Sequence, residues 1–194
     1  MIIVFSGTDG AGKSTQIDLV RLFYKKNARK VRHLWARGGY TPGFNFLKNI
    51  LRCMLGKSLP GSGISEDRKA ILKKKSVSNV WLTLAILDLI LFYAVYARGL
   101  SWLGRVVICD RYIEDTYLDF THNFGSSFKA NSFLWKLLIF LAPKPDHSFL
   151  LTVPVDVSMY RSTLKNEPFP DTPKTLEWRL QMYMDEVIFP SSRF

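Results

Sequence analysis

Cysteine is scarce in this sequence, and its scarcity excludes two classes of small protein. The chain has 194 residues and two cysteines, Cys53 and Cys109. They lie far apart, with no CxxC pair and no histidine cluster beside them, so neither a disulfide framework nor a zinc site is predicted. A chain this poor in thiols suits a reducing compartment, and we expect a cytoplasmic protein.

Signs of secretion, repeats and low-complexity segments are missing from the pattern as well. The apolar run over residues 1–5 is too short for a signal peptide and continues directly into a glycine-rich motif, so it indicates a first strand. Apolar residues make up 47% of the chain and charged residues 22%, which is typical of a globular protein. We therefore expect a single domain over residues 1–194.

Acidic residues are outnumbered by basic ones. The chain has 16 Asp and Glu against 27 Lys and Arg, a formal net charge of +11. Such an excess fits nucleic acid, an anionic membrane surface or small polyanions such as nucleotides. The cations are scattered along predicted helices, with one denser run at residues 73–75, and no RNA- or DNA-binding signature accompanies them. We therefore expect nucleotides, not nucleic acid, as partners.

One long apolar run raises the question of a membrane helix. Residues 80–97 contain a single charged residue, Asp88, and their length of about 18 residues approaches what a bilayer span requires. A carboxylate at the centre of a span is costly, and the run lies between segments that resemble a soluble α/β protein. We expect a buried central helix and no membrane span.

Strand and helix patterns alternate along the chain. Such alternation favours a parallel sheet with helices on both faces, a three-layer α/β fold. Ligands bind such sheets beyond the carboxyl ends of the strands. The predicted strands cover residues 2–5, 31–35, 106–109 and 148–153, and the predicted helices cover residues 13–27, 44–55, 65–75, 80–97, 114–121, 132–141 and 155–164.

Residues 7–14, GTDGAGKS, match the phosphate-binding pattern GxxxxGK[ST] between a predicted strand and a predicted helix. Backbone N–H groups of such a loop surround phosphate oxygens, and the helix dipole adds to the attraction. We expect Lys13, in a solvent-facing loop, to neutralise the β and γ phosphates of ATP, and the Ser14 hydroxyl to ligate Mg²⁺. The residues predicted to hold the ATP phosphates are Gly7, Asp9, Gly10, Ala11, Gly12, Lys13, Ser14 and Thr15.

A second motif, Asp110-Arg111, follows the predicted strand 106–109. Its acid and its arginine would face the same crevice as the phosphate loop if the two strands are neighbours. Asp110 is then a candidate metal ligand, directly or through water. Arg111 is a candidate to fork onto a phosphoryl oxygen.

Three motifs in this order resemble the thymidylate kinase family of nucleoside monophosphate kinases. They are GTDGAGKSTQ at residues 7–16, VICDRY at 107–112 and Pro-Asp at 145–146, and together they cover nearly the whole chain. The resemblance implies a P-loop NTPase fold with a lid segment, and transfer of a phosphoryl group from ATP to dTMP with Mg²⁺. It also implies that Asp9 meets the acceptor's sugar hydroxyl and that Asp110 and Arg111 act at the phosphates.

The same resemblance suggests acceptor-binding residues and two departures. Arg37, in an Arg-Gly-Gly loop after the second strand, is expected to bind the acceptor monophosphate, together with Asp9 and Arg111. Asp88 and Tyr117 lie where the family has further acceptor contacts. The family's base-reading arginine is replaced by Leu89, and its glutamine after the Asp-Arg-Tyr motif is absent. dTMP is therefore the leading acceptor, and another phosphate acceptor is the first alternative.

The C-terminal part of the chain is expected to supply a lid over residues 161–174. Arg161 and Lys165 lie four apart on one helical face, so both are catalytic candidates that would close over the phosphates. The end at Phe194 suggests that the C-terminal part of the usual fold is missing, which leaves an ATP-binding protein without catalysis as another alternative. The family's habit of pairing through helices suggests a homodimer through residues 80–97.

Overall fold

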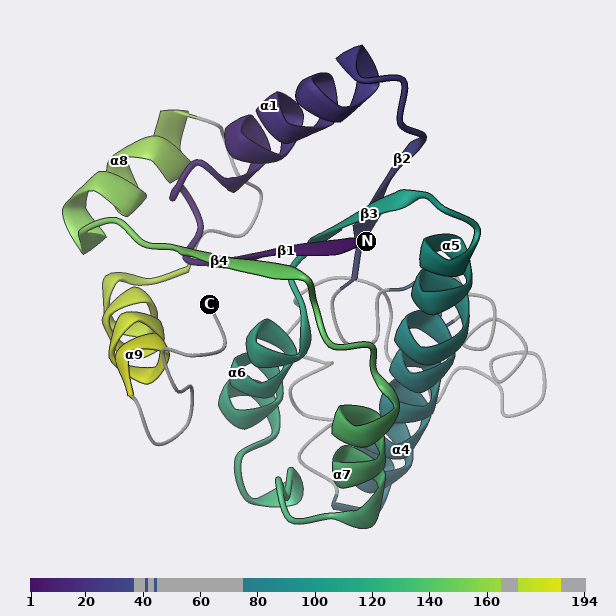
Figure 1. The fold of residues 1–194 in the computed structure, drawn as a ribbon. Helices are drawn as coiled ribbons and strands as arrows, with labels where there is room; N and C mark the ends of the chain where they lie inside the picture. The colour runs from purple at the N-terminus through teal and green to yellow at the C-terminus, as the bar shows by residue number, and fades with distance from the viewer. Residues whose placement is uncertain (37–40, 42–43, 45–74, 165–170, 186–194) are drawn as a thin grey trace. The chain divides into compact units, whose positions relative to one another are not determined.

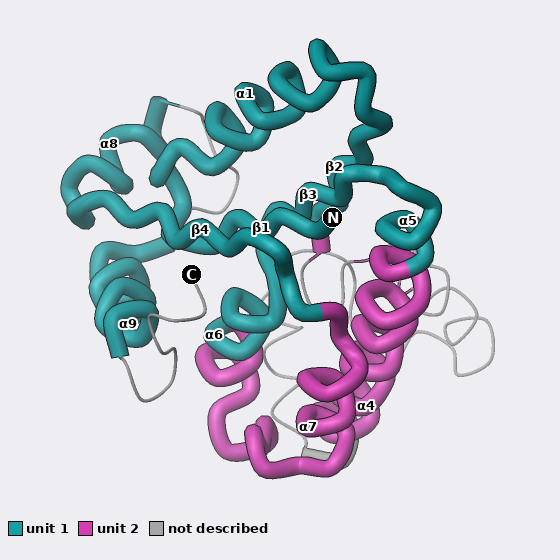
Figure 2. Tube along the Cα trace, viewed as in Figure 1, with its two compact units in different colours: residues 1–35, 99–118, 144–194 teal, residues 36–98, 119–143 magenta. Residues whose placement is uncertain are grey.

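The computed structural model describes residues 1–36, 41, 44, 75–164 and 171–185. They fall into two compact units (Figure 2), of which the first holds residues 1–35, 99–118 and 144–194 and the second residues 36–98 and 119–143. The helices predicted over residues 44–55 and 65–75 lie, apart from their end residues, outside the described residues. The single domain stays a prediction.

A parallel sheet of four strands organises the first unit. The strands are β1 (Ile2–Gly7), β2 (Val31–Trp35), β3 (Val106–Asp110) and β4 (His147–Leu151), in the order β2-β3-β1-β4. All three strand pairs are parallel. The four predicted strands and the parallel arrangement are therefore confirmed, with differences of one or two residues at the ends.

Helix α1 (Lys13–Lys26) covers one face of this sheet (Figure 1). Ile17, Val20 and Tyr24 recur at helical spacing. They pack in a buried cluster with Phe5 from β1 and Ile108 from β3. Burying these side chains supplies the main stabilisation of this layer, because apolar area removed from water contributes about 25 cal/mol per Å². The helix predicted over residues 13–27 is confirmed.

The opposite face is covered by α6 (Ile113–Phe124) and α9 (Pro173–Met184) (Figure 1). Adjacent residues of β4 take opposite sides: Leu151 packs with the α1 cluster, whereas Leu150 packs with Leu118 of α6 and Tyr183 of α9. Helices on both faces confirm the three-layer fold. Helix α9 was not predicted. Its first residues, Pro173 and Lys174, belong to the segment expected as the lid, and the lid stays a prediction.

The sequence reasoning overlooked two ordinary signals for the start of α9. Thr172 caps α9 by accepting a hydrogen bond from the Thr175 N–H at 3.2 Å, and Pro173 occupies the first turn, where its missing N–H costs nothing. The preceding helix α8 (Val155–Leu164) coincides with its predicted range and includes Arg161. The remainder of the expected lid, residues 165–170, lies outside the described residues.

Helices make up most of the described part of the second unit. A continuous helix runs through α4 (Lys75–Ile90) and a π-helical segment (Leu91–Ala97) and passes into the first unit within α5 (Arg98–Trp102). Helix α7 (Phe133–Leu141) packs against α4. Their core is aromatic: Trp81 stacks on Phe124 with 5.0 Å between ring centroids, and Trp135 meets Phe128 edge-on at 5.0 Å.

Residues Val77–Trp102 are long and apolar enough to cross a bilayer by length and composition, and no other helix among the described residues passes this test. Of their most apolar window, 44% is buried inside the protein. The core helix of a soluble protein meets the same criteria. The helix predicted over residues 80–97 is thus confirmed as a helix, and the absence of a span stays a prediction.

Candidate active site

The carboxyl ends of β1, β2 and β3 meet at a small polar cleft in the first unit. Parallel strands end at the same edge of their sheet, and the register pairs Trp35 at the end of β2 and Phe5 in β1 with Asp110 at the end of β3. The cleft has a volume of about 120 Å³. Its lining consists of Asp9, Gly10, Ala11, Gly12, Lys13, Ser14, Trp35, Asp110 and Arg111.

Glycines shape the loop between β1 and α1. Gly7 has φ +134°, and a Cβ atom there would lie 1.9 Å from the Leu151 carbonyl oxygen, so any side chain would push β1 away from β4. Gly12, with φ +89°, stands immediately before α1 in the left-handed conformation, and its carbonyl accepts from the Gln16 N–H. The loop therefore ends in the exposed first turn of a helix, an arrangement suited to anions.

Lys13 is buried, which corrects the expectation of a solvent-facing residue. Its side chain is 8% exposed, and its Nζ donates to the Gly7 carbonyl at 2.9 Å and to the Thr8 carbonyl at 2.7 Å. Burial, and then the Arg111 charge, lowers the pKa of Lys13 to about 8. The ammonium group is held inside the curve of the loop, beside the place where phosphates would bind.

Arg111 is fixed between two carboxylates. One of its guanidinium NH₂ groups donates to Asp9 in the phosphate loop, and the other donates to Asp115 at 3.4 Å. Its backbone is left-handed, with φ +76°, a conformation that non-glycine residues adopt only when their surroundings hold them. The tertiary structure thus points this arginine into the cleft at a cost in backbone strain.

Asp115 connects the cleft to α9. It is 1% exposed and accepts hydrogen bonds from the Tyr183 hydroxyl at 2.6 Å, the Tyr112 N–H at 3.0 Å and the Gly7 N–H at 3.4 Å. Burial, and then the Asp115 charge, raises the pKa of Tyr183 well above its usual value, so the phenol stays protonated and donates. One carboxylate therefore orients Arg111, the start of the phosphate loop and the C-terminal helix.

Asp110 has an unsatisfied oxygen at the cleft. Its Oδ1 is buried and has no hydrogen-bond partner among the described residues, and its Oδ2 lies 4.0 Å from His33 Nε2. Burial raises the pKa of this carboxyl, opposed most by the Lys13 charge. Ser14, in the exposed first turn of α1, lines the same cleft. Carboxylate and hydroxyl oxygens suit Mg²⁺, so these two residues fit the predicted metal site.

Helix α8 is attached to the phosphate loop by two hydrogen bonds. Arg161 donates to the Gly10 carbonyl at 2.9 Å, and the Ser158 hydroxyl donates to the Asp9 carbonyl at 2.6 Å. Arg161 is therefore brought to the loop, where it was expected to act, although it contacts backbone. Its expected companion, Lys165, lies outside the described residues.

The residues predicted to bind the acceptor lie in both units. In the first unit, Tyr117 is half-buried and packs with Leu118 and Tyr183, away from the cleft lining. In the second unit, the Thr41 hydroxyl donates to Asp88, whose pKa is raised by burial. Leu89 is fully buried. Arg37 lies outside the described residues. The roles of these residues in acceptor binding stay predictions.

Three functional candidates were missed by the sequence reasoning. Trp35 ends β2, a position that could have been noticed because strand ends carry ligand sites. Asp115 lies in the first turn of α6, where an acid is a recognised signal, although of helix starts and not of active sites. No sequence signal marks Tyr183, because its partner is 68 residues away.

Comparison with known proteins agrees with the motifs. No family model matches the chain. The thymidylate kinase of Caldicellulosiruptor saccharolyticus is 30% identical over 164 residues, which are 82% of this chain and 68% of that protein. The thymidylate kinase of Wolbachia pipientis wMel is 26% identical over 86% of this chain and 74% of its own length. That of Bartonella quintana is 28% identical over 85% and 68%. With these similarities and a phosphate-loop cleft built on a parallel sheet, the chain belongs to the thymidylate kinase family.

Proposed function

We propose that this phosphotransferase moves the γ-phosphoryl group of ATP onto a nucleoside monophosphate, with dTMP as the first candidate acceptor. The single observation that carries the proposal is the cleft itself. It gathers a buried lysine, a strained arginine and an unsatisfied carboxylate oxygen, from Lys13, Arg111 and Asp110, around a glycine-built anion site. The relatives quoted above are thymidylate kinases by name.

The residues of the cleft would act by position and charge, without a covalent intermediate. Lys13 would leave the loop carbonyls, which now accept its hydrogen bonds, and bind the β and γ phosphates. Arg111 would exchange its bond to Asp9 for a phosphoryl oxygen, while Asp115 keeps the guanidinium oriented. Both cations are prearranged, so little reorganisation is required as charge develops on the transferring group.

Ser14 and Asp110 would hold Mg²⁺, which supplies charge neutralisation at the bound phosphates. Arg161, attached to the Gly10 carbonyl, would keep a positive charge beside the loop. Asp9 would be released from Arg111 when phosphate binds, and its carboxylate would then be available to the acceptor's sugar hydroxyl. Lys165, Arg37, Asp88 and Tyr117 complete the proposed set of catalytic and acceptor-binding residues.

A coupled ADP-release assay tests this function. ATP and Mg²⁺ would be offered with dTMP, dUMP, UMP, CMP, AMP or GMP, and Lys13→Ala would be compared with Lys26→Ala at the exposed end of the same helix. We expect turnover on dTMP that the first substitution abolishes and the second leaves unchanged. Turnover equal in both variants would remove Lys13 from the mechanism, and silence on all six acceptors would favour the alternatives.

A different phosphate acceptor is supported by one observation in the second unit. Leu89, in place of the family's arginine, is fully buried, and Phe120, in place of its glutamine, is 1% exposed within the aromatic core. Neither side chain offers a hydrogen bond to a base, so base selectivity would be low. A panel extended to sugar phosphates separates this alternative from a protein that binds ATP without transferring it.

We also propose pairing of two copies through the helix at residues 80–97. Val80, Leu87, Leu91 and Val95 are each at least 42% exposed and lie four or seven residues apart, so they form an apolar stripe. Light scattering measures the mass in solution. A monomer at micromolar concentration would rule out this dimer.

A further inference from the structure

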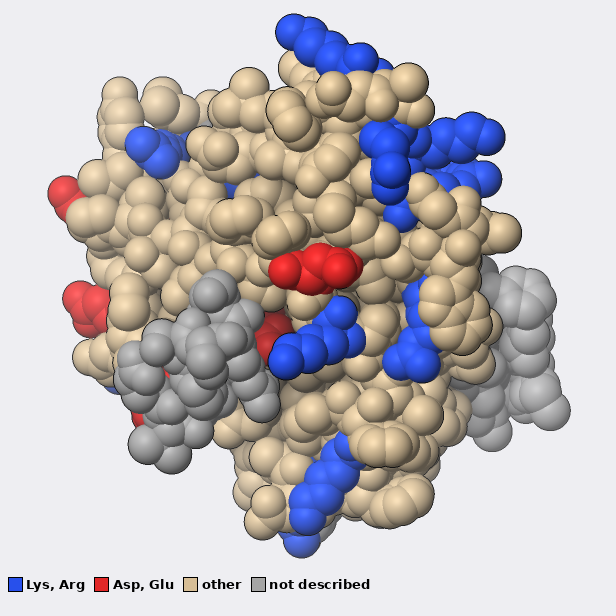
Figure 3. Space-filling view, viewed as in Figure 1, with Lys and Arg blue, Asp and Glu red and all other residues tan. Residues whose placement is uncertain are grey.

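Six basic side chains gather at the amino edge of the sheet, opposite the cleft. Lys25 and Lys26 end α1, Arg29 and Lys30 form the turn into β2, Arg32 lies on β2, and Arg105 immediately precedes β3. The Val106 N–H donates to the Lys30 carbonyl at 2.9 Å, which joins the last of these segments to the others. Figure 3 shows blue side chains gathered over the end of α1 and β2, with no red among them.

Among the described residues, these six cations lack the ion pairs that Arg21 and Arg179 of the same unit make. Within the described part of the chain, none of the six has a carboxylate within 4.0 Å or a side-chain hydrogen bond. By contrast, Arg21 is paired with Asp18 at 2.9 Å and Arg179 with Asp171 at 2.9 Å. The unpaired charge therefore remains available to an external anionic partner.

The outer face of α1 next to these cations is apolar. Leu19, Leu22 and Phe23 are 55%, 54% and 60% exposed, and their spacing of three and four residues sets them on one face. Ile17 and Tyr24 occupy the opposite face, where they pack on the sheet. An α-helix that covers a sheet needs only one apolar face, so the second one calls for a partner.

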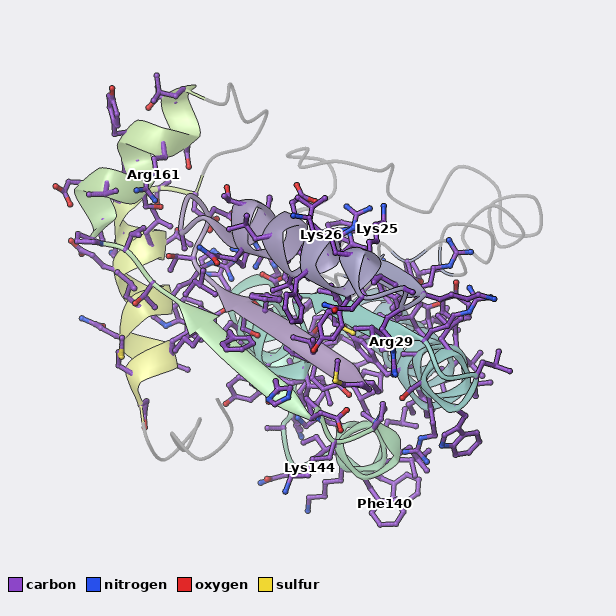
Figure 4. The ribbon with its side chains drawn as sticks, turned by 45° about the horizontal axis from the view of Figure 1, so that its top comes forward. Lys25, Lys26, Arg29, Phe140, Lys144 and Arg161 are labelled. Atoms are coloured by element: carbon purple, nitrogen blue, oxygen red, sulfur yellow. The ribbon has the colours of Figure 1, made fainter. Side chains whose placement is uncertain are left out.

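We propose that this amino-edge patch, defined as Leu19, Leu22, Phe23 and the six cations, binds the surface of an anionic lipid bilayer. Exposed leucine and phenylalanine side chains enter the boundary between headgroups and acyl chains, and flanking lysines and arginines meet the anionic headgroups. Figure 4 shows Lys25, Lys26 and Arg29 at one end of α1 and Arg161 beyond the other. The cleft would stay open to nucleotides while the opposite edge contacts lipid.

Charge and apolar area together favour this occupant over two others. A second copy of the chain would bring six unpaired cations against six, which is unfavourable. Nucleic acid would neutralise the cations through its phosphates but would leave the leucines and the phenylalanine in water. Only a lipid surface uses both halves of the patch. The proposal is independent of the kinase reaction, because no patch residue lines the cleft.

Vesicle flotation of the full chain tests the proposal. We expect binding to vesicles of phosphatidylcholine mixed with phosphatidylglycerol and none to phosphatidylcholine alone. The double substitution Lys25→Glu and Lys26→Glu should lower the vesicle affinity at least about tenfold, because each cation near an anionic surface contributes about fivefold. The pair Lys129→Glu and Lys174→Glu, at exposed positions outside the patch, changes the net charge equally and should have little effect.

The apolar half of the patch has a test of its own. Leu22→Ser with Phe23→Ser should remove the binding that survives high salt, since screening weakens only the electrostatic part. Tyr160→Ser with Leu164→Ser, two exposed positions on α8, is the matched control. Thermal melting and ATP affinity should not change in the two patch variants.

Three results would overturn the proposal. The first is failure to float with anionic vesicles, and the second is equal loss of binding in the patch and control charge variants, which would indicate a nonspecific effect of net charge. The third is vesicle binding that the double serine variant retains in full at high salt. Tight binding to a homopolymer RNA without vesicle binding would assign the cations to nucleic acid instead.

Discussion

Basic side chains lie at both edges of the sheet in the first unit. They have hydrogen-bond partners at the carboxyl edge and none among the described residues at the amino edge. At the carboxyl edge, Lys13, Arg111 and Arg161 each donate to a carbonyl or a carboxylate. At the amino edge, five exposed cations and the half-buried Arg105 have no partner among the described residues. Positive charge is thus oriented by neighbours where it would meet transferring phosphates, and left unpaired where a broad anionic surface would suffice.

The largest difference between the two edges is expected when the charge of Lys13 is removed. Lys13→Met keeps a long side chain in its buried position but removes the charge, and we expect kcat to fall about 100- to 1,000-fold, the cost of removing a prearranged stabilising group. Steady-state kinetics with dTMP would measure it. Lys26→Met, at the other end of α1, is the control, and an equal effect in both would mean that the edges do not differ.

Asp115 is the next largest test, because it supports the carboxyl edge without lining the cleft. Asp115→Ala leaves Arg111 without its buried partner and two backbone N–H groups with fewer acceptors, and we expect a loss of about 3 kcal/mol in the free energy of unfolding. Urea denaturation measures this loss. A change below 1 kcal/mol would show that Arg111 is held by other contacts.

The protonation of Lys13 makes the carboxyl edge sensitive to pH. Its pKa is lowered to about 8, so the ammonium group is charged below pH 8 and loses its proton above it. Bound phosphates favour the charged form, and ATP binding above pH 8 therefore requires proton uptake. We expect ATP affinity to be about fivefold weaker at pH 9 than at pH 8. Calorimetry would detect it, and Lys13→Met should abolish the dependence.

Tyr183→Phe removes a single hydrogen bond from this network. The ring still packs in its cluster, but Asp115 loses its 2.6 Å donor, and we expect about 1 kcal/mol less stability. Tyr24→Phe is a fair control, because among the described residues the Tyr24 hydroxyl reaches only the Met1 sulfur, at 3.7 Å. A kcat that falls while KM for ATP stays constant would mark Tyr183 as a positioning residue. If both substitutions cost the same, the network has no special role.

The amino edge should give the smallest effect on nucleotide binding. Lys25→Glu with Lys26→Glu changes the charge at the far end of α1 from the phosphate loop, beyond the range of strong interaction in physiological salt. We expect ATP affinity to change less than about twofold. Fluorescence titration measures it, and a tenfold loss would mean that the two edges are electrically coupled.

Much of this architecture could be predicted from local patterns. The four strands, α1 and α8 follow from apolar periodicity, and the phosphate loop from its glycines and its place between strand and helix. The acid and arginine after β3 were also predictable, since strand ends of a parallel sheet meet at one edge. The place of an acceptor site stays a prediction, because Leu89 and Phe120, at positions where the family has polar side chains, carry no polar group that would indicate a ligand.

Helix α9 shows where local reasoning failed. Thr172 and Pro173 form an ordinary helix start that the sequence reasoning did not use. Packing stabilises this helix, because Trp178 and Tyr183 pack against Leu118 and Leu150. Such burial depends on residues far apart in the chain and leaves no short-range signal.

The sequence by itself determined the βαβ opening, the anion-binding loop and the excess of positive charge, because strand periodicity, glycine turns and composition are local properties of the chain. Only the tertiary structure decided which cations are held by partners and which have none among the described residues. Lys13 became a buried residue with a lowered pKa, and Arg111 became oriented by Asp115 and Tyr183. The reason is physical: burial and charge pairing depend on neighbours that only the folded chain brings together.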